Sequence, residues 1–120
     1  MTSITNKGLE LEHSYKDVIL DVMRNVFVKN GKLVLRVSGS SMYPVLQNGA
    51  CVAVTKCSFE NLKIGDIIVY QKFKTHVTIH RVNSIIKDGD LTYLRTQGDN
   101  NECLDEYIVS VSDFWGKVEV

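Results

Sequence analysis

Short apolar runs separated by turn residues fill the chain from Lys32 onward, and they restrict the fold more than any other feature of the sequence. β-Branched residues dominate these runs, and turn residues such as Gly49 and Asp88-Gly89 separate them. This pattern is typical of strands joined by tight turns. We therefore expect a mainly β, mostly antiparallel fold, with strands at 32–37, 50–55, 66–73, 77–86, 91–96, 107–111 and 115–120.

The segment before these strands has the periodicity of a helix. Apolar residues recur there at spacings of three and four, at Val18, Ile19, Val22, Met23, Val26 and Phe27. We expect one N-terminal amphipathic helix over residues 14–29, with Ser14 as N-cap, Asp17 in the first turn and Asn30-Gly31 at its end. The apolar stripe is expected to pack on the sheet, and the alternative is a docking helix. Residues 1–13 are predicted to form a loose arm.

Length and composition indicate one domain over residues 1–120, with residues 32–120 as its β catalytic core. Fourteen basic residues balance 14 acidic ones, so the charge gives no indication of nucleic-acid binding. No apolar run is long enough for a membrane span. The three cysteines form no CxxC pair, and an odd number of cysteines fits a reducing compartment. Of these cysteines, Cys51 is expected in the core.

Ser41 lies in a run of small residues that follows the first predicted strand. Residues 38–41 are Ser-Gly-Ser-Ser, and Pro44, the only proline of the chain, comes three residues later. Small residues allow a sharp turn that leaves a hydroxyl uncovered, and proline fixes one backbone dihedral of that turn. A hydroxyl held on a rigid turn is what nucleophilic catalysis needs, although the same composition occurs in ordinary loops.

A predicted hairpin brings a histidine and a carboxylate together. With Asp88-Gly89 as its two turn residues, His80 faces Gln97 across the hairpin, and Asp99 lies just past the end of the return strand. A β-bulge would shift this register by one residue. A serine hydroxyl needs a base to take its proton, and a carboxylate behind a histidine fixes the tautomer of the imidazole. Ser41, His80 and an aspartate therefore supply the three roles of a catalytic triad.

The remaining polar candidate residues are not predicted to be catalytic or to bind a metal. Asp66 follows Gly65 and is predicted to form a turn, and His76 is predicted to be structural. A zinc site made of His76, His80 and Cys103 would lack a fourth ligand and a recognisable spacing. No metal and no cofactor are therefore predicted.

Five segments resemble the signal peptidase I family and occur in that family's order, over the chain from about Leu33 to its end. They are Ser41-Met42-Tyr43-Pro44 with the strand that follows Gly49, then Gly65–Val69, Ile79–Val82, Gln97–Asn101 and Trp115–Val118. The resemblance implies a signal-peptidase/LexA-like β fold. It also implies that Ser41 is the nucleophile and that His80 stands at the position of the general base.

The residue at the base position separates two kinds of signal peptidase. The common bacterial kind has a lysine there, whereas the archaeal and endoplasmic-reticulum kind has histidine followed by Arg-Val, as in His80-Arg81-Val82. In the second kind a Gly-Asp-Asn-Asn segment precedes the catalytic aspartate. The resemblance therefore ranks Asp105 first as the triad acid and Asp99 as a supporting acid, whereas the hairpin count favours Asp99.

The resemblance also places the oxyanion and substrate-binding groups around the nucleophile, at Gly39, Ser40, Met42 and Pro44. Some signal peptidases have a side-chain donor two residues before the nucleophile, where this chain has Gly39. Backbone N–H groups around Ser41 are therefore the expected oxyanion donors, with Ser40 as a further candidate. A second departure from the family is Gly49-Ala50, where the family usually has Gly-Asp.

The sequence thus predicts a small serine endopeptidase that acts on a peptide or protein substrate. The resemblance implies an extended substrate segment, added to a strand edge and read through small side chains near the cut. Because no membrane span is predicted, we expect a cytoplasmic enzyme, with a precursor or a modified-peptide leader as its substrate.

Two other functions fit the same features. One is a non-catalytic peptide-binding module that keeps the fold. The other is self-cleavage, as in LexA-type repressors, which normally use a lysine base and carry a DNA-binding domain.

Overall fold

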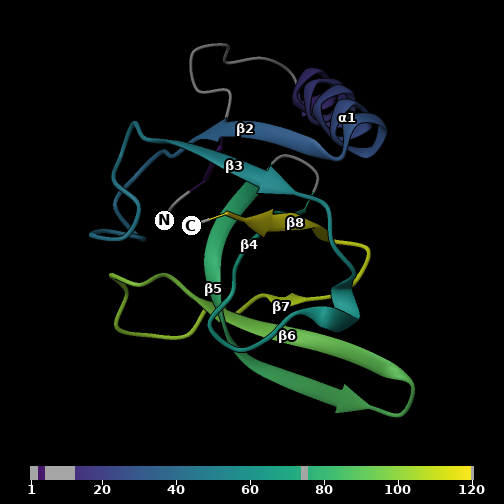
Figure 1. The fold of residues 1–120 in the computed structure, drawn as a ribbon, viewed down its shortest axis with the longest axis vertical. Coiled ribbons are helices and arrows are strands. Elements are labelled where there is room, and N and C mark those ends of the chain that lie inside the picture. The colour runs from purple at the N-terminus through teal and green to yellow at the C-terminus, as the bar shows by residue number, and fades with distance from the viewer. Residues whose placement is uncertain (1–2, 5–12, 74–75, 120) are drawn as a thin grey trace.

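The strands form one antiparallel sheet in this computed structural model, which describes residues 3–4, 13–73 and 76–119 (Figure 1). The described sheet has the order β2-β3-β8-β4-β5-β6-β7, and β1 pairs with β5 outside this path. The mainly β fold with one helix is confirmed. The elements are β1 Ser3–Ile4, α1 His13–Asn30, β2 Lys32–Arg36, β3 Cys51–Thr55, the short 3₁₀ helix η2 Phe59–Asn61, β4 Ile67–Lys72, β5 His76–Asp88, β6 Leu91–Gln97, β7 Ile108–Val109 and β8 Phe114–Val118.

The long strand β5 connects the two halves of the sheet. Its first part, His76 to Arg81, pairs with β4, and its second part, Arg81 to Asp88, pairs with β6. The register with β6 shifts between Val82 and Ser84, which marks a β-bulge at Asn83. A bulge bends a strand and increases its twist, so the β5–β6 hairpin extends away from the rest of the sheet (Figure 1).

Two hydrophobic clusters lie on the two faces of the sheet. Strand β4 contributes to both, because Ile67 and Val69 point to one face while Ile68 and Tyr70 point to the other. The first cluster contains Leu20, Phe27, Leu35, Val37, Met42, Leu46, Val52, Val54, Ile67, Val69, Val77, Ile79, Trp115 and Val118. The second contains Phe59, Leu62, Ile68, Tyr70, Val82, Leu94, Val109 and Phe114.

Helix α1 packs on the sheet as expected, and the expected stripe is correct at Met23 and Phe27, but the buried face is rotated from it toward Leu20. Leu20 and Phe27 are buried and Met23 packs against the first cluster, whereas Val22 and Val26 are 56% and 43% exposed. The predicted stripe was therefore wrong at both valines. Residues 20, 23 and 27 share one helix face, and tertiary contacts select this face rather than the one with more valines.

The end of the helix is as predicted. Gly31 has a left-handed φ of 72°, and its N–H donates to the carbonyl of Phe27 over 2.7 Å. Such a glycine satisfies a terminal helix carbonyl at no steric cost. The predicted cap at Ser14 and Asp17 concerns side chains that lie outside the described residues.

Three further expectations need correction. Cys51 is exposed, because its side chain points to the outer face of β3 while Val52 and Val54 fill the core. The predicted loose arm contains strand β1, which pairs with Val77 and Thr78 of β5, and its residues 5–12 lie outside the described part of the chain.

The register of the β5–β6 hairpin also differs from the count. Asp88 pairs with Leu91, so the turn residues are Gly89 and Asp90. Gly89 has a φ of 60°, and the first central position of a type II′ turn requires such a glycine. Together with the bulge at Asn83, this change places Arg81 opposite Gln97, so the predicted pairing of His80 with Gln97 was wrong.

Gly116 of β8 allows the helix and the sheet to approach closely. A Cβ atom at this position would lie 2.5 Å from the carbonyl oxygen of Thr55 and 2.7 Å from Cζ of Phe27. Both distances are far below van der Waals contact, so a methyl group fits only if the helix or strand β3 moves.

We predict that Gly116→Ala lowers the free energy of unfolding by about 1–3 kcal/mol, the usual cost of overpacking a core. Urea denaturation followed by circular dichroism measures this change. Gly31→Asn is the matched control, because its site has no atom within 4 Å and asparagine tolerates a left-handed φ. A Gly116→Ala variant no less stable than this control would contradict the packing argument.

Candidate active site

Ser41 follows strand β2 in a compact turn. The turn is closed by backbone hydrogen bonds from Tyr43 N to the Ser40 carbonyl (3.1 Å) and from Leu46 N to the Met42 carbonyl (2.9 Å). The peptide bond between Tyr43 and Pro44 is cis. The Met42 side chain is fully buried in the first hydrophobic cluster, so it anchors the turn to the core. Ser41 itself is 2% exposed.

His80 reaches the serine from the middle of the sheet. It lies on β5, pairs with Ile68 of β4, and is fully buried. Its Nε2 atom lies 3.0 Å from Oγ of Ser41, which is hydrogen-bond distance. A strand between two paired neighbours has little freedom to move, so the imidazole is held on a rigid element.

Asp105 approaches the other side of the imidazole from the segment after β6. Its Oδ2 lies 2.5 Å from Nδ1 of His80. The backbone of Asp105 is held twice, because its N–H donates to the Thr96 carbonyl (2.9 Å) and its carbonyl accepts from the Arg95 guanidinium (2.9 and 3.2 Å). Ser41, His80 and Asp105 therefore form one continuous chain of hydrogen-bonding groups.

The surroundings of Asp105 keep its carboxyl ionised. Burial alone would raise the pKa of Asp105, but hydrogen bonds from His80 and Thr96 and the nearby charges of His80 and Lys72 outweigh burial and lower this pKa. An ionised carboxylate only accepts hydrogen bonds, so Nδ1 of His80 carries the proton of the hydrogen bond between His80 and Asp105. Nε2 of a neutral His80 is then free of a proton and accepts one from Ser41.

The Gly98–Asn101 turn fastens the serine turn to the hairpin. The backbone N–H of Asn100 donates to the Ser41 carbonyl (2.8 Å), and its side-chain amide donates to the Ser40 carbonyl (3.1 Å). A Cβ atom at Gly98 would lie 2.6 Å from the Ser41 carbonyl oxygen and 3.0 Å from Nε2 of His80. Position 98 therefore requires glycine, because a side chain would not fit between Ser41 and His80.

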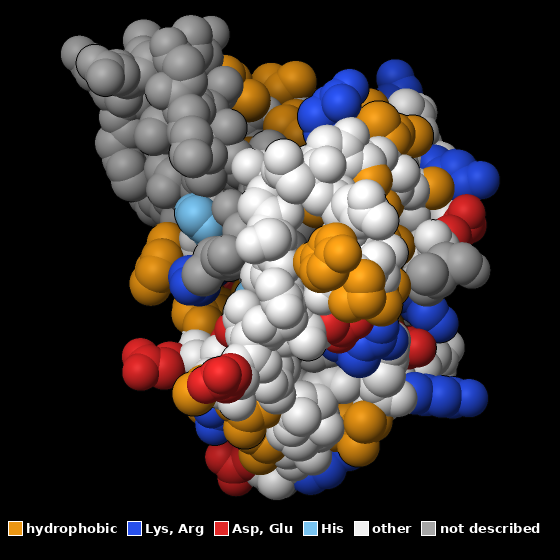
Figure 2. Space-filling view, turned by 90° about the vertical axis from the view of Figure 1, so that its left-hand side faces the viewer, with side chains coloured by type: hydrophobic (Ala, Val, Ile, Leu, Met, Phe, Trp, Pro, Cys, Tyr) orange, Lys and Arg blue, Asp and Glu red, His pale blue; other side chains and the backbone are white. Residues whose placement is uncertain are grey.

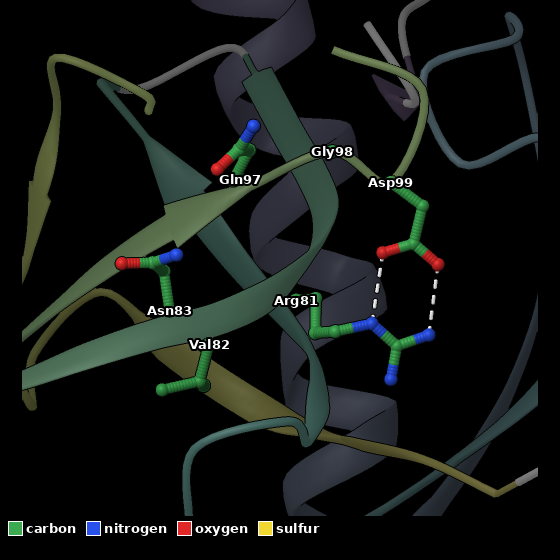
Figure 3. A pocket seen from close by; sticks show the side chains of 6 residues that line it. All are labelled: Arg81, Val82, Asn83, Gln97, Gly98 and Asp99. Carbon is green, nitrogen blue, oxygen red and sulfur yellow. Dashed lines mark hydrogen bonds and ion pairs between the residues drawn. The ribbon is translucent and has the colours of Figure 1, made fainter. Parts of the chain in front are cut away.

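Asp99 is placed with Arg81 and not with His80. Both carboxylate oxygens of Asp99 accept from the Arg81 guanidinium, each over 2.8 Å, and Nη1 of Arg81 donates to the Gly65 carbonyl (2.7 Å) (Figure 3). Hydrogen bonding to Asp99 raises the pKa of Arg81. This bidentate pair lies at a cavity of about 230 Å³ whose lining is Arg81, Val82, Asn83, Gln97, Gly98 and Asp99.

The remaining predicted residues of the serine turn differ in exposure. Ser40 and Pro44 are exposed, and Gly39 is half-buried with a φ of 96°. The N–H of Gly39 donates to Oδ1 of Asn48 (2.8 Å). Because the Met42 side chain is buried, any contact of Met42 with a substrate would involve its backbone.

Asp66 and His76 lie outside this group of residues. Asp66 accepts from the Lys63 N–H (2.9 Å) and pairs with Lys117 (3.2 Å), which confirms its role in a turn. Nε2 of His76 is buried without a hydrogen-bond partner among the described residues, and burial lowers the pKa of His76. No group of three histidine, cysteine or acidic residues in the described part of the chain is arranged to hold a metal ion.

Sequence reasoning missed two residues that contact the acid. Thr96 Oγ1 donates to Oδ2 of Asp105 over 2.7 Å, and the Tyr70 hydroxyl lies 3.0 Å from Thr96 Oγ1. Thr96 lies two residues after Leu94, which is buried, so strand alternation indicated an inward-facing hydroxyl at this position. The position of Tyr70 depends on the pairing of three strands, and no local pattern shows it.

We predict that the stability contributed by Asp105 disappears in acid. Because the pKa of Asp105 is lower in the folded chain than in the unfolded chain, this contribution is fully present above about pH 4 and is lost as the pH falls through the folded pKa. Urea denaturation of the wild type and Asp105→Asn at a series of pH values measures it. The difference in unfolding free energy should shrink on acidification, and a difference that is constant or grows would contradict this prediction.

Comparisons with known proteins agree with the resemblance seen in the sequence. The family model described as Peptidase S24-like matches residues 5–118. Signal peptidase I W of Bacillus subtilis (strain 168) is 31% identical over 81 residues, which are 67% of this chain and 43% of that protein. The chain thus spans less than half the length of this curated relative.

Two further findings concern solved structures and membrane-spanning helices. No solved structure matches at a significant level. Among the described residues, no helix has the length and apolar character that crossing a membrane requires. The matched residues are nearly all of the chain and include Ser41, His80 and Asp105. The chain therefore belongs to the Peptidase S24-like family of signal-peptidase/LexA-like proteins.

Proposed function

We propose that this chain is a serine endopeptidase in which Ser41 is the nucleophile, His80 the general base and Asp105 the acid that orients the histidine. One observation carries the proposal. Oγ of Ser41 lies 3.0 Å from Nε2 of His80, while Nδ1 of the same ring lies 2.5 Å from Oδ2 of Asp105. These are the contacts through which a serine–histidine–aspartate triad activates a hydroxyl.

In the proposed reaction, His80 takes the proton of Ser41 as Oγ attacks the carbonyl carbon of a peptide bond. The imidazolium that forms is stabilised by ionised Asp105, and it then gives its proton to the leaving amine. Water hydrolyses the acyl-enzyme with His80 again acting as base. Because Ser41 is 2% exposed, substrate binding must include a local opening at the serine turn.

The proposed oxyanion donors are backbone N–H groups of the turn that contains Ser41. Gly39 N–H already donates to Asn48, so this group is not available without a rearrangement. The exposed Ser40 side chain is the further candidate donor. One such donor typically contributes about 3 kcal/mol to transition-state stabilisation, so backbone groups alone supply a substantial part of catalysis.

The proposed substrate is an extended peptide segment that pairs with the edge of β2. Strand β2 ends the order of the described sheet, and it leads directly into the serine turn. A segment added along this edge would have its backbone directed toward Ser41. The edge residue Val34 is 68% exposed, and Tyr43 and Val45 of the serine turn are 52% and 45% exposed.

The face that carries the serine turn suits a substrate of mixed character. In Figure 2, hydrophobic side chains gather near the middle of this face, with acidic and basic side chains next to each other below them. A surface without an excess of one charge favours neither a strongly acidic nor a strongly basic peptide. The proposed substrate is a precursor or a modified-peptide leader, and small side chains near the cut are what the family resemblance implies.

As part of the same proposal, the enzyme acts in the cytosol. All three cysteines, Cys51, Cys57 and Cys103, are free thiols. Unpaired thiols are typical of proteins in reducing compartments. The name of the Bacillus relative describes a signal peptidase, and for this chain a peptidase activity on a leader segment is the corresponding proposal.

We predict that a fluorophosphonate probe labels wild-type protein once, on Ser41, and that Ser41→Ala shows no adduct by intact mass spectrometry. His80→Ala and Asp105→Ala should label more slowly by a factor on the order of 10³ or more, because removing a triad member removes the activation of the serine. Ser58→Ala removes an exposed hydroxyl far from this group in the sequence and should label like the wild type.

Two results would contradict the proposed function. One is the absence of an adduct on folded wild-type protein over the neutral and alkaline pH range, and the other is equal labelling of wild type and Ser41→Ala. Either result would favour a non-catalytic peptide-binding module, in which Ser41→Ala leaves peptide binding unchanged.

A further inference from the structure

Two buried hydroxyl groups reach the triad acid from the strands on either side of the histidine strand. Tyr70 lies on β4 and Thr96 on β6, and these strands flank β5, which carries His80. Tyr70 and Thr96 are 1% and 0% exposed. Their hydroxyl oxygens are 3.0 Å apart and both lie near Oδ2 of Asp105, at 2.7 Å for Thr96 and 3.4 Å for Tyr70.

The number of available protons fixes the direction of these hydrogen bonds. A carboxylate has no proton to give, so Thr96 donates its single hydroxyl proton to Asp105. Thr96 Oγ1 then has only lone pairs to offer, so the phenol donates its proton to Thr96 Oγ1 or, over the longer 3.4 Å contact, directly to Oδ2 of Asp105. In either case both hydroxyls direct their protons toward Asp105, Tyr70 directly or through Thr96, and Asp105 accepts the Nδ1 proton of His80.

The buried phenol of Tyr70 keeps its proton at neutral pH, so it can act as a donor. Burial, the largest effect, raises the pKa of Tyr70, and both the charge of nearby Asp105 and the hydrogen bond to its carboxylate raise this pKa further. The Tyr107 ring stacks on the Tyr70 ring with centroids 6.2 Å apart and planes 4° apart. Burial thus favours the protonated phenol of Tyr70, and stacking on Tyr107 fixes the orientation of its ring.

Packing alone does not explain these two hydroxyls. A phenylalanine and a valine would fill the same volume without burying polar atoms, and a buried hydroxyl costs free energy unless it is hydrogen-bonded. Here both hydroxyls are hydrogen-bonded, and their chain ends on the one carboxylate oxygen that also accepts from His80. Their arrangement therefore favours one state of Asp105, ionised and turned toward the imidazole.

We propose that Tyr70 and Thr96 are positioning residues of the triad, which hold Asp105 as the acceptor that keeps His80 in its Nδ1–H tautomer. This inference rests on the proposed function and extends it to two residues whose hydroxyl groups contact Asp105. The Nδ1–H tautomer leaves Nε2 without a proton, as a general base requires. Without the hydroxyl chain, Oδ2 loses a donor and the carboxylate is free to turn away from His80.

The test compares variants that separate the hydroxyl from the side-chain volume. Thr96→Val keeps the branched shape and removes the hydroxyl, whereas Thr96→Ser keeps the hydroxyl and removes a methyl group. Tyr70→Phe removes only the phenol oxygen. Circular dichroism and two-dimensional amide spectra establish that each variant is folded, and Tyr70→Phe and Thr96→Ser keep the test decisive if Thr96→Val does not fold.

The first readout does not depend on activity. Long-range ¹H–¹⁵N correlation spectra of the three histidine rings distinguish the two tautomers, and His80→Gln identifies the His80 signals. We expect the Nδ1–H tautomer of His80 in wild type and Thr96→Ser. In Thr96→Val we expect loss of the single tautomer, and in Tyr70→Phe a partial loss. An unchanged His80 spectrum in both Thr96→Val and Tyr70→Phe would overturn the proposal.

The second readout is the rate of fluorophosphonate labelling of Ser41. In Thr96→Val we expect a fall of about 100-fold in the maximal labelling rate with little change in probe affinity, since displacement of a catalytic group by about 1 Å has this effect. Thr96→Ser should restore most of the rate. A wild-type rate in Thr96→Val would overturn the positioning role while the proposed function stands.

The two readouts also separate a failure of the proposed function. If wild type does not label but Thr96→Val loses the His80 tautomer, the serine peptidase proposal fails and the positioning role of the hydroxyl chain is supported. Equal stability losses in Thr96→Val and Thr96→Ser, with the same tautomer in both, would show that Thr96 is only a packing residue.

Discussion

The contact between the Gly98–Asn101 turn and the serine turn is the constraint on which the site depends. Ser41 comes from the end of β2, and His80 and Asp105 come from the β5–β6 half of the sheet. Asn100 joins these parts by donating to the carbonyls of Ser40 and Ser41, and Gly98 supplies the space that the contact needs. This contact therefore helps to hold the Ser41 hydroxyl at the His80 imidazole.

The site is a set of buried polar groups that satisfy one another. His80 and Thr96 are fully buried and Ser41 and Tyr70 nearly so, and each of these side chains has a hydrogen-bond partner. Buried polar groups without partners would destabilise the core by about 1–3 kcal/mol each. The same low-dielectric surroundings strengthen every hydrogen bond that is made, so stability and the orientation of the proposed triad depend on the same contacts.

Much of the fold follows from local patterns in the sequence. Alternating β-branched runs predicted strands β2 to β8 to within about two residues, although not β1, and Asn30-Gly31 predicted the end of α1. The burial of Phe27 was predicted, but the exposure of Val22 and Val26 was not, because the exact face depends on contacts such as that between Phe27 and the space that Gly116 leaves in β8. Such contacts join distant parts of the chain and leave no local periodicity.

In the candidate site too, the sequence predicted some residues correctly, whereas contacts between distant segments decided the placement of others. Ser41 and His80 were candidates from local chemistry, and the resemblance to signal peptidases ranked Asp105 above Asp99. Counting along the hairpin favoured Asp99 because neither the Gly89-Asp90 turn nor the bulge at Asn83 could be seen in the sequence. In the structure Asp99 is held by Arg81, and Asp105 reaches His80 through a loop whose path depends on Thr96 and Arg95.

The most direct test of the account is a crystal structure of the protein after reaction with a fluorophosphonate. The account predicts phosphorus bonded to Oγ of Ser41, His80 Nε2 within hydrogen-bond distance of the adduct, and Asp105 still bound to Nδ1. An adduct on any other side chain, or a Ser41 that stays unmodified in protein that has reacted, would contradict the assignment of Ser41 as the nucleophile.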